Sequence, residues 1–256
     1  MRLVRLLILT LGVSLCGAAA ASDLGKEKRW AEQIVDALLD GEAVYLNDGR
    51  TEFLALETES TAGDSRRAAI VMHGTGVHPN WPTVVQPLRV GLTEAGWHTL
   101  SIQMPVLPNE AEHAAYADIY DWVPGRIDAG IRHLRDQGFQ TIVLVGHSQG
   151  STMAVYYLSR QPQPVEGFVA VGMSGGIASG PMDTLAQLPA LAVPTLDLYG
   201  SEDLPEVLDS AEERAAQARK AGGDYSQQVV AGADHFFDGE EAELLEAVNA
   251  WLATRY

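Results

Sequence analysis

The sequence predicts an α/β fold with a mostly parallel central sheet and helices on both faces. Short apolar runs alternate along the chain with amphipathic stretches of helical length, which is the pattern of such folds. Residues 68–72 form a continuous apolar run, as expected for a strand that is buried on both faces. The length of 256 residues, without internal repeats or a long linker, suits one sizeable domain.

The first half of the chain contains a predicted strand pair followed by alternating helices and strands. The turn of the strand pair falls at Asn47, Asp48 and Gly49. Gly96 ends the first predicted helix, and Pro124 breaks or kinks the second, because proline cannot donate a helical hydrogen bond. The expected elements are strands at 43–46, 53–56, 68–72 and 97–103, with helices at 82–95 and 116–137.

The second half continues the alternation. Its expected elements are strands at 139–145, 165–171, 195–199 and 226–230, with helices at 149–160, 205–221 and 240–253. The longest inserts, residues 104–115 and 173–192, are modest, and the second contains a short helix. We therefore expect no large lid domain.

Residues 1–21 have the pattern of a secretory signal peptide. Arg2 and Arg5 precede an apolar run at 6–15 and a small-residue stretch that ends at Ala21. The run is too short for an ordinary membrane span. We expect export, with the periplasm favoured over full secretion, a single domain at 22–256 and no stable membrane insertion after cleavage. An uncleaved anchor and a lipid-modified Cys16 are the less favoured alternatives.

Cysteine content and charge exclude several classes of protein. Cys16 is the only cysteine, so the mature protein is expected to have neither a disulfide nor a thiol nucleophile. The formal net charge of −17 disfavours binding to nucleic acid and to anionic membranes, and it favours neutral or cationic substrates. The oligomeric state stays undetermined at this stage.

The strongest motif is Gly146-x-Ser148-x-Gly150, between a predicted strand and a predicted helix. A serine hydroxyl is a weak nucleophile, and a sharp strand-to-helix turn presents it to a base. Glycines are needed there because side chains would collide with the neighbouring backbone. Ser148 is therefore the candidate nucleophile, and an incidental serine in a glycine-rich turn is the alternative.

The same pattern predicts an acid and then a histidine later in the chain. His235 is the only histidine beyond Ser148, and it lies between the last expected strand and the closing helix. Asp203 follows the strand at 195–199 and is our choice for the acid that orients this base, with Glu202 second. Asp234 is too near the histidine in sequence for easy geometry.

An oxyanion hole requires two backbone donors. The N–H of Gln149 is one, since this residue follows the nucleophile, and the loop after residues 68–72 supplies the other. We assign the second donor to Thr75, with Gly74 and Gly76 as alternatives. His73 is expected to pack and to form hydrogen bonds that shape this loop.

No metal site or cofactor is predicted. The histidines have no metal-ligand spacing, and the glycines form neither a phosphate-binding loop nor a dinucleotide fingerprint. Four aromatic residues either line an acyl pocket or, as we favour for most of them, pack in the core: Trp81, Tyr116, Tyr120 and Trp122.

These motifs resemble those of the α/β-hydrolase superfamily across nearly the whole mature chain. The segments 73–82, 96–101 and 104–105 are more narrowly similar to an uncharacterised family of bacterial exported α/β-hydrolase-like proteins. The resemblance implies the α/β-hydrolase fold and the positions of Ser148, Asp203 and His235, and it implies no particular substrate.

The leading functional hypothesis is a serine hydrolase of the carboxylesterase type. It would act on a small-molecule or acyl substrate with a carboxylic ester or thioester bond, through an acyl-enzyme on Ser148. The alternative is a non-catalytic envelope protein that binds a ligand on the same scaffold. The dense loop at 80–82 motivates this alternative, since it would narrow access to the site.

Overall fold

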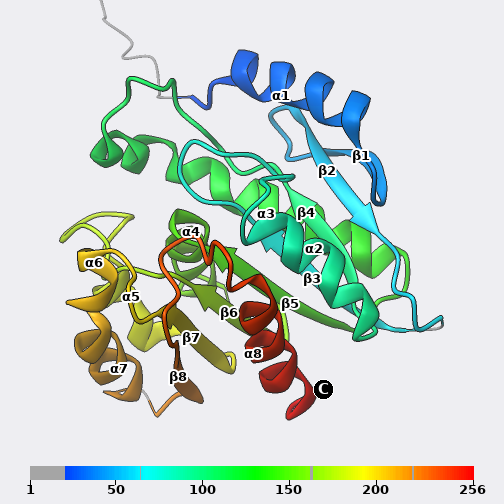
Figure 1. The fold of residues 1–256 in the computed structure, drawn as a ribbon. Coiled ribbons are helices and arrows are strands. Elements are labelled where there is room, and N and C mark those ends of the chain that lie inside the picture. The colour runs from blue at the N-terminus through cyan, green and yellow to red at the C-terminus, as the bar shows by residue number, and fades with distance from the viewer. Residues whose placement is uncertain (1–20, 64, 162–163, 221) are drawn as a thin grey trace, which may run out of the picture.

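The structure is a computed structural model that describes residues 21–63, 65–161, 164–220 and 222–256. The expected signal peptide lies outside these residues except for Ala21. Eight strands form one sheet in the order β1-β2-β4-β3-β5-β6-β7-β8 (Figure 1). Strands β3 to β8 are parallel to one another, whereas β2 is antiparallel to both of its neighbours. The predicted α/β fold with a mostly parallel sheet is confirmed.

All eight expected strands are present, with small changes of boundary. The strands are β1 (Glu42–Asn47), β2 (Glu52–Thr58), β3 (Arg67–Met72), β4 (His98–Ile102), β5 (Thr141–His147), β6 (Gly167–Val171), β7 (Thr195–Gly200) and β8 (Tyr225–Val230). The helices are α1 (Leu24–Ala37), α2 (Val85–Glu94), α3 (Val123–Asp136), α4 (Gln149–Leu158), α5 (Thr184–Gln187), α6 (Pro205–Leu208), α7 (Ala211–Lys220) and α8 (Glu241–Ala253), with 3₁₀ helices η1 (His113–Trp122) and η2 (Leu188–Ala190).

Helix α1 is the element that the sequence analysis missed. The side chain of Asp23 accepts a hydrogen bond of 2.9 Å from the N–H of Lys26, which caps the helix and stabilises it by about 1 kcal/mol. Its buried residues Ala31 and Ile34 pack against Leu54 and Leu56 of β2. A cap residue followed by apolar residues at helical spacing is a signal that was present in the sequence.

The predicted boundaries of two helices were wrong. Helix α2 begins at Val85 instead of residue 82, because Val84 has a φ of 57° and lies outside the helical region. The predicted helix at 205–221 is two helices, α6 and α7, and residue 221 lies outside the described residues. Between them, Ser210 accepts a hydrogen bond of 2.9 Å from the N–H of Gly175 and so ties this turn to another loop.

The break predicted at Pro124 is present as a change of helix type. The 3₁₀ helix η1 ends at Trp122 and α3 begins at Val123, with Pro124 in its first turn. Proline is tolerated there because the first helical N–H groups have no partner within the helix.

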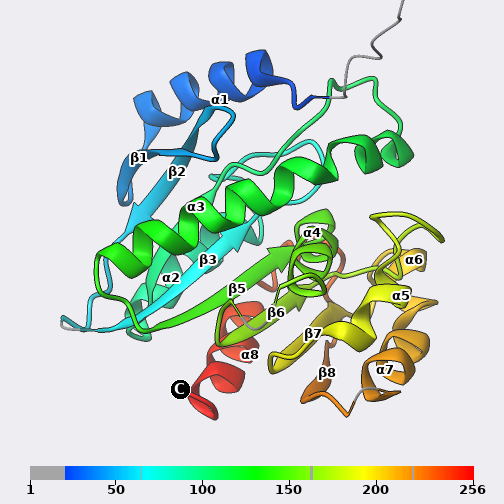
Figure 2. The ribbon, with the colours of Figure 1, turned by 180° about the vertical axis from the view of Figure 1, so that it is seen from behind.

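Helices cover both faces of the sheet. Helices α2 and α8 pack on one face, and α3 and α4 pack on the other (Figures 1 and 2). Side chains of β3 alternate between the two cores: Ile70 and Met72 enter one, and Ala69 and Val71 enter the other. Because the central strands are parallel, their carboxyl ends meet at one edge, where the loops after β3, β5, β7 and β8 converge.

Candidate active site

Ser148 lies at a sharp turn between β5 and α4. Its φ is 54° and its ψ is −121°, a backbone conformation that non-glycine residues rarely adopt. A Cβ atom at Gly146 would lie 2.7 Å from the backbone nitrogen of Ser151, and one at Gly150 would lie 2.6 Å from the carbonyl oxygen of Met72. The two glycines therefore permit the close approach of backbone that this turn requires.

Helix α4 begins directly after Ser148, which is its N-cap residue. The N-terminal N–H groups of a helix have no acceptor within the helix, and the helix dipole makes this end positive. The N–H of Ser148 itself donates to the carbonyl of Val171, at 2.8 Å. The next N–H, of Gln149, donates to no acceptor in the described part of the protein.

The carboxylate of Asp203 contacts the ring of His235. Oδ1 of Asp203 lies 2.6 Å from Nδ1 of His235, and both side chains are buried. An ionised carboxylate only accepts hydrogen bonds, so Nδ1 carries the proton and Nε2 is the nitrogen that can accept one. Glu202 is exposed, and exposed Asp234 accepts a hydrogen bond from the N–H of Phe236 instead. Of the carboxylates considered from the sequence, Asp203 is the one that contacts the histidine.

The two residues assigned to the oxyanion hole are joined by their side chains. Oγ1 of Thr75 donates a hydrogen bond of 2.6 Å to Oε1 of Gln149. The backbone N–H of Thr75, like that of Gln149, donates to no acceptor among the described residues. Both residues line the same pocket as Ser148. The structure thus brings the loop after β3 beside the start of α4.

His73 anchors the loop that carries Thr75. Nε2 of His73 accepts the N–H of Met104 at 2.9 Å, so Nδ1 carries the proton and donates to the carbonyl of Gly74, also at 2.9 Å. In a trans peptide the C=O and the N–H point in opposite directions. Binding of the Gly74 carbonyl therefore directs the N–H of Thr75 away from His73. Burial lowers the pKa of His73 to about 3, which keeps the ring neutral.

His147 is a second buried histidine beside the candidate site. Its Nε2 donates to the carbonyl oxygen of His235 at 3.0 Å, and the centroids of the two rings are 5.0 Å apart. Burial, assisted by the neighbouring His235, lowers the pKa of His147 to about 4. His147 is therefore a neutral donor that holds the backbone of His235 in place. No role was predicted for His147 from the sequence.

A pocket of about 500 Å³ opens at this edge of the sheet and is lined by Ser148 and His235. Trp81 forms part of its wall. The other three aromatic residues considered from the sequence are buried in the core: Tyr116, Tyr120 and Trp122. Trp81 therefore places the loop at 80–82 beside the pocket.

Several pocket residues carried no signal in the sequence. They come from η1, from the loop after β6, from α6 and from the loop after β8: His113, Ile177, Met182, Glu206 and Phe236. Each lies in or beside a loop, where neither periodicity nor a motif marks it. Their position follows only from the convergence of these loops at the carboxyl edge.

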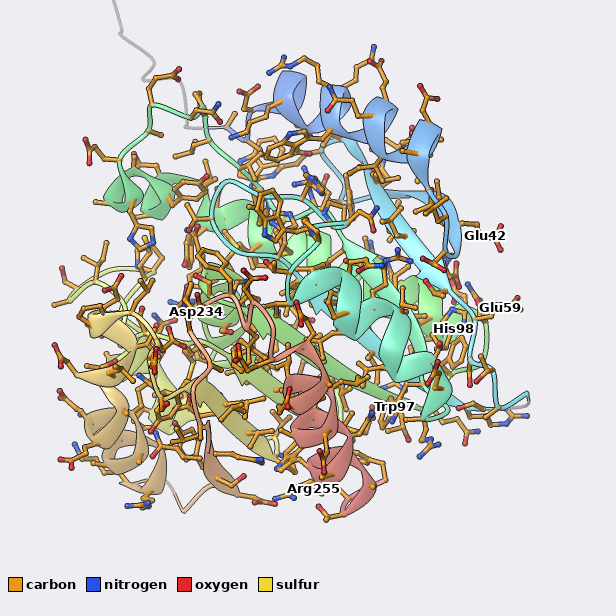
Figure 3. The ribbon with its side chains drawn as sticks, in the orientation of Figure 1. Glu42, Glu59, Trp97, His98, Asp234 and Arg255 are labelled. Carbon is orange, nitrogen blue, oxygen red and sulfur yellow. The ribbon has the colours of Figure 1, made fainter. Side chains whose placement is uncertain are left out.

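A second cluster of titratable groups lies at the other end of the strands. Glu57 accepts hydrogen bonds from Nε2 of His98 at 2.7 Å and from Nε2 of His133 at 2.8 Å. These hydrogen bonds outweigh burial and hold the pKa of Glu57 well below its usual range. His98 begins β4, far from Asp234 on the loop after β8 (Figure 3). Across the described residues, no group of three or more His, Cys, Asp or Glu side chains is arranged to hold a metal ion.

Comparison with known proteins identifies the fold. Among solved structures, the chain superposes on a dienelactone hydrolase from Anabaena variabilis ATCC 29413, with a TM-score of 0.67, 21% identity and coverage of 84% of this chain and 97% of that chain. An α/β serine hydrolase homologue from Coxiella burnetii gives a TM-score of 0.68 at 18% identity, over 84% and 99% of the two chains. The fold is that of the α/β hydrolases, and no large lid domain is evident in the described residues.

Sequence comparison also finds a relative and a family. "Lipase LipV" from Mycobacterium tuberculosis (strain ATCC 25618 / H37Rv) is 28% identical over 172 residues, which is 63% of this chain and 59% of that lipase. No helix in the described residues is both long and apolar enough to cross a membrane. The profile of the family described as "Protein of unknown function (DUF3530)" matches residues 17–120 and 108–254. The chain belongs to this family of α/β-hydrolase-like proteins.

Proposed function

We propose that this protein is a serine hydrolase that cleaves carboxylic esters through an acyl-enzyme on Ser148. The observation that carries the proposal is the buried contact of 2.6 Å between Asp203 and His235, because the ring of His235 lines the same pocket as Ser148. The similarity to a lipase and the fold shared with a dienelactone hydrolase favour ester bonds. A thioester would be cleaved by the same groups.

The proposed acylation step begins with attack of Ser148 Oγ on the carbonyl carbon of the ester. Nε2 of His235 takes the hydroxyl proton, and Asp203 stabilises the imidazolium that results. The N–H groups of Gln149 and Thr75 donate to the oxyanion, beside the positive end of α4. When the carbon–oxygen bond to the alcohol breaks, His235 returns the proton to the leaving oxygen.

Deacylation repeats these steps with water. His235 removes a proton from the water as its oxygen attacks the acyl carbon, and the proton then passes to Ser148 Oγ as the acid leaves. The same oxyanion donors act a second time. Two buried neutral histidines support this arrangement: His73 through the Thr75 loop and His147 through the backbone of His235.

The test is covalent labelling with a fluorophosphonate, which reacts with activated serines. We expect label on Ser148 by mass spectrometry and none in Ser148→Ala. Ser174→Ala is the matched control, because this serine lines the same pocket, and among the described residues its hydroxyl accepts the N–H of Gly176 and forms no hydrogen bond with a histidine. Absence of label from the folded protein would overturn the proposal and favour the alternative of a non-catalytic ligand-binding protein.

We also propose that the protein is exported, on the basis of Arg2, Arg5 and the apolar run that precedes Ala21. Expression of the full chain in a bacterial host with Sec-dependent export should give a periplasmic protein that begins at or near Ser22. N-terminal sequencing measures this directly. A cytoplasmic product that retains Met1 would contradict it.

A further inference from the structure

Among the residues that the structure describes, one acidic residue lines the pocket without an ion-pair partner. This residue is Glu206, in α6, and no other Asp, Glu, Lys or Arg of the described chain lines the pocket. Its carboxylate is exposed and forms no ion pair with any residue that the structure describes. The other carboxylate of the site, Asp203, is buried and accepts a hydrogen bond from His235. The carboxylate of Glu206 therefore adds a negative charge at the pocket that no ion pair within the described residues offsets.

The mouth of the pocket is apolar. Ile177, Leu204 and Phe236 line it and are 37%, 40% and 43% exposed. They are three of the eight exposed large hydrophobic residues in the described part of the chain, so such residues are concentrated at the pocket. They come from the loop after β6, from the residue before α6 and from the loop after β8. Such a rim is stabilised when an apolar ligand group removes it from water.

We infer that the substrate is an individual small-molecule ester that carries an apolar acyl chain or an aromatic group. It has no negative charge near the ester bond. This rests on the proposed function and specifies its substrate class. The apolar part lies across Ile177, Leu204 and Phe236, while Glu206 selects neutral and cationic molecules over anionic ones. The protein's net charge of −17 acts in the same direction and disfavours an anionic lipid surface as the site of action.

The exposure of Glu206 to solvent sets how strongly its charge discriminates between cationic and anionic substrates. Two unit charges several ångströms apart in a largely aqueous medium change an affinity by only a small factor, and salt reduces it. The carboxylate of Glu206 raises the affinity for a cationic substrate and lowers the affinity for an anionic one. We therefore expect their kcat/KM values to differ by about tenfold at low salt and by less at high salt.

The test uses three chromogenic aryl esters with acyl chains of equal length that end in a methyl, a trimethylammonium or a carboxylate group. Glu206→Gln removes the charge from the pocket, and Glu202→Gln removes a charge from an exposed residue that does not line it. Both variants change the net charge by one. We expect the cation-to-anion ratio of kcat/KM to fall about threefold or more in Glu206→Gln and to stay unchanged in Glu202→Gln.

The apolar rim is tested with a second pair of variants. Ile177→Ser should lower the kcat/KM of a medium-chain ester, relative to the acetyl ester, by about fivefold, because the longer chain loses an apolar contact. Val229→Ser is the control: Val229 is also exposed, on β8, and does not line the pocket. An equal effect of the two variants would overturn the assignment of the rim.

The two proposals fail in different ways. Fluorophosphonate label on Ser148 together with ester turnover, but with equal rates for the three esters or a preference for the anionic one, would overturn this inference alone. Label without turnover of the neutral apolar ester would also overturn it. Absence of both label and turnover would overturn the proposed function, and this inference would fall with it.

Discussion

Replacement of His147 by glutamine should make the stability of the protein less sensitive to acid. Burial lowers the pKa of His147 to about 4, whereas the group has its ordinary value of 6.5 when the chain is unfolded. Below that ordinary value the unfolded chain therefore binds a proton that the folded protein does not bind. Stability falls as the pH decreases, and this continues until the pH approaches the folded pKa.

The magnitude follows from these two pKa values. Between about pH 7.5 and pH 5 this one histidine lowers the free energy of unfolding by about 2 kcal/mol. Glutamine is neutral at every pH, and its amide nitrogen can still donate to the carbonyl of His235, the bond that His147 makes at 3.0 Å. His147→Gln should thus lose about 2 kcal/mol less than the wild type over the same range.

Urea unfolding, followed by tryptophan fluorescence at the two pH values, measures this difference. His113→Gln is the matched control, because His113 lines the same pocket but is exposed, and it should behave as the wild type does. If the curves of His147→Gln and the wild type shift equally with pH, the reasoning is refuted. His147 would then titrate alike in the folded and unfolded states, and burial would not keep its ring neutral in acid.

Three further substitutions test individual parts of the structure. Asp203→Asn should lower kcat by about 10³- to 10⁴-fold, measured with an activated aryl ester, because the amide no longer stabilises the imidazolium. Gly74→Ala should lower kcat by about tenfold or more in the same assay, since the added Cβ would lie 3.0 Å from Cβ of Ser148. Asp197→Ala should cost about 3–5 kcal/mol in urea unfolding, because it leaves the fully buried Arg214 without its carboxylate; adding Arg214→Met should recover part of that loss.

The fold could be predicted because its determinants are local. The apolar run 68–72, between amphipathic segments of helical length, has the pattern of a buried strand in a parallel sheet, and all eight strands were expected. Helix boundaries were less predictable where a single residue decides them. The positive φ of Val84 delays the start of α2, and the hydrogen bonds of Ser210 separate α6 from α7. Nothing in the sequence around these residues shows such tertiary contacts.

The candidate site likewise contains residues that a local sequence pattern marks and residues that only tertiary contacts define. Ser148, Asp203 and His235 follow strands in a recognisable order, and the structure brings all three to one edge of the sheet. Specificity residues such as Glu206 and Ile177 have no comparable signal. Their meaning depends on which other loops face them, and that becomes visible only when the sheet is assembled.

The chemical role of each histidine in this protein depends on its hydrogen-bond partners and its burial, and the residue type alone does not determine it. His73 and His147 form hydrogen bonds with backbone groups; burial keeps both neutral, which suits them to hold loops in place. His235 has a carboxylate on Nδ1, which suits it to exchange a proton at Nε2.

A histidine–carboxylate pair is not sufficient for catalysis, however. Glu57 binds both His98 and His133, yet none of these residues lines the pocket of Ser148. The proposed chemistry requires the histidine of such a pair to line a pocket together with a serine on a strained turn and with free backbone donors. Among the described residues, only the carboxyl edge of the sheet combines all of these features.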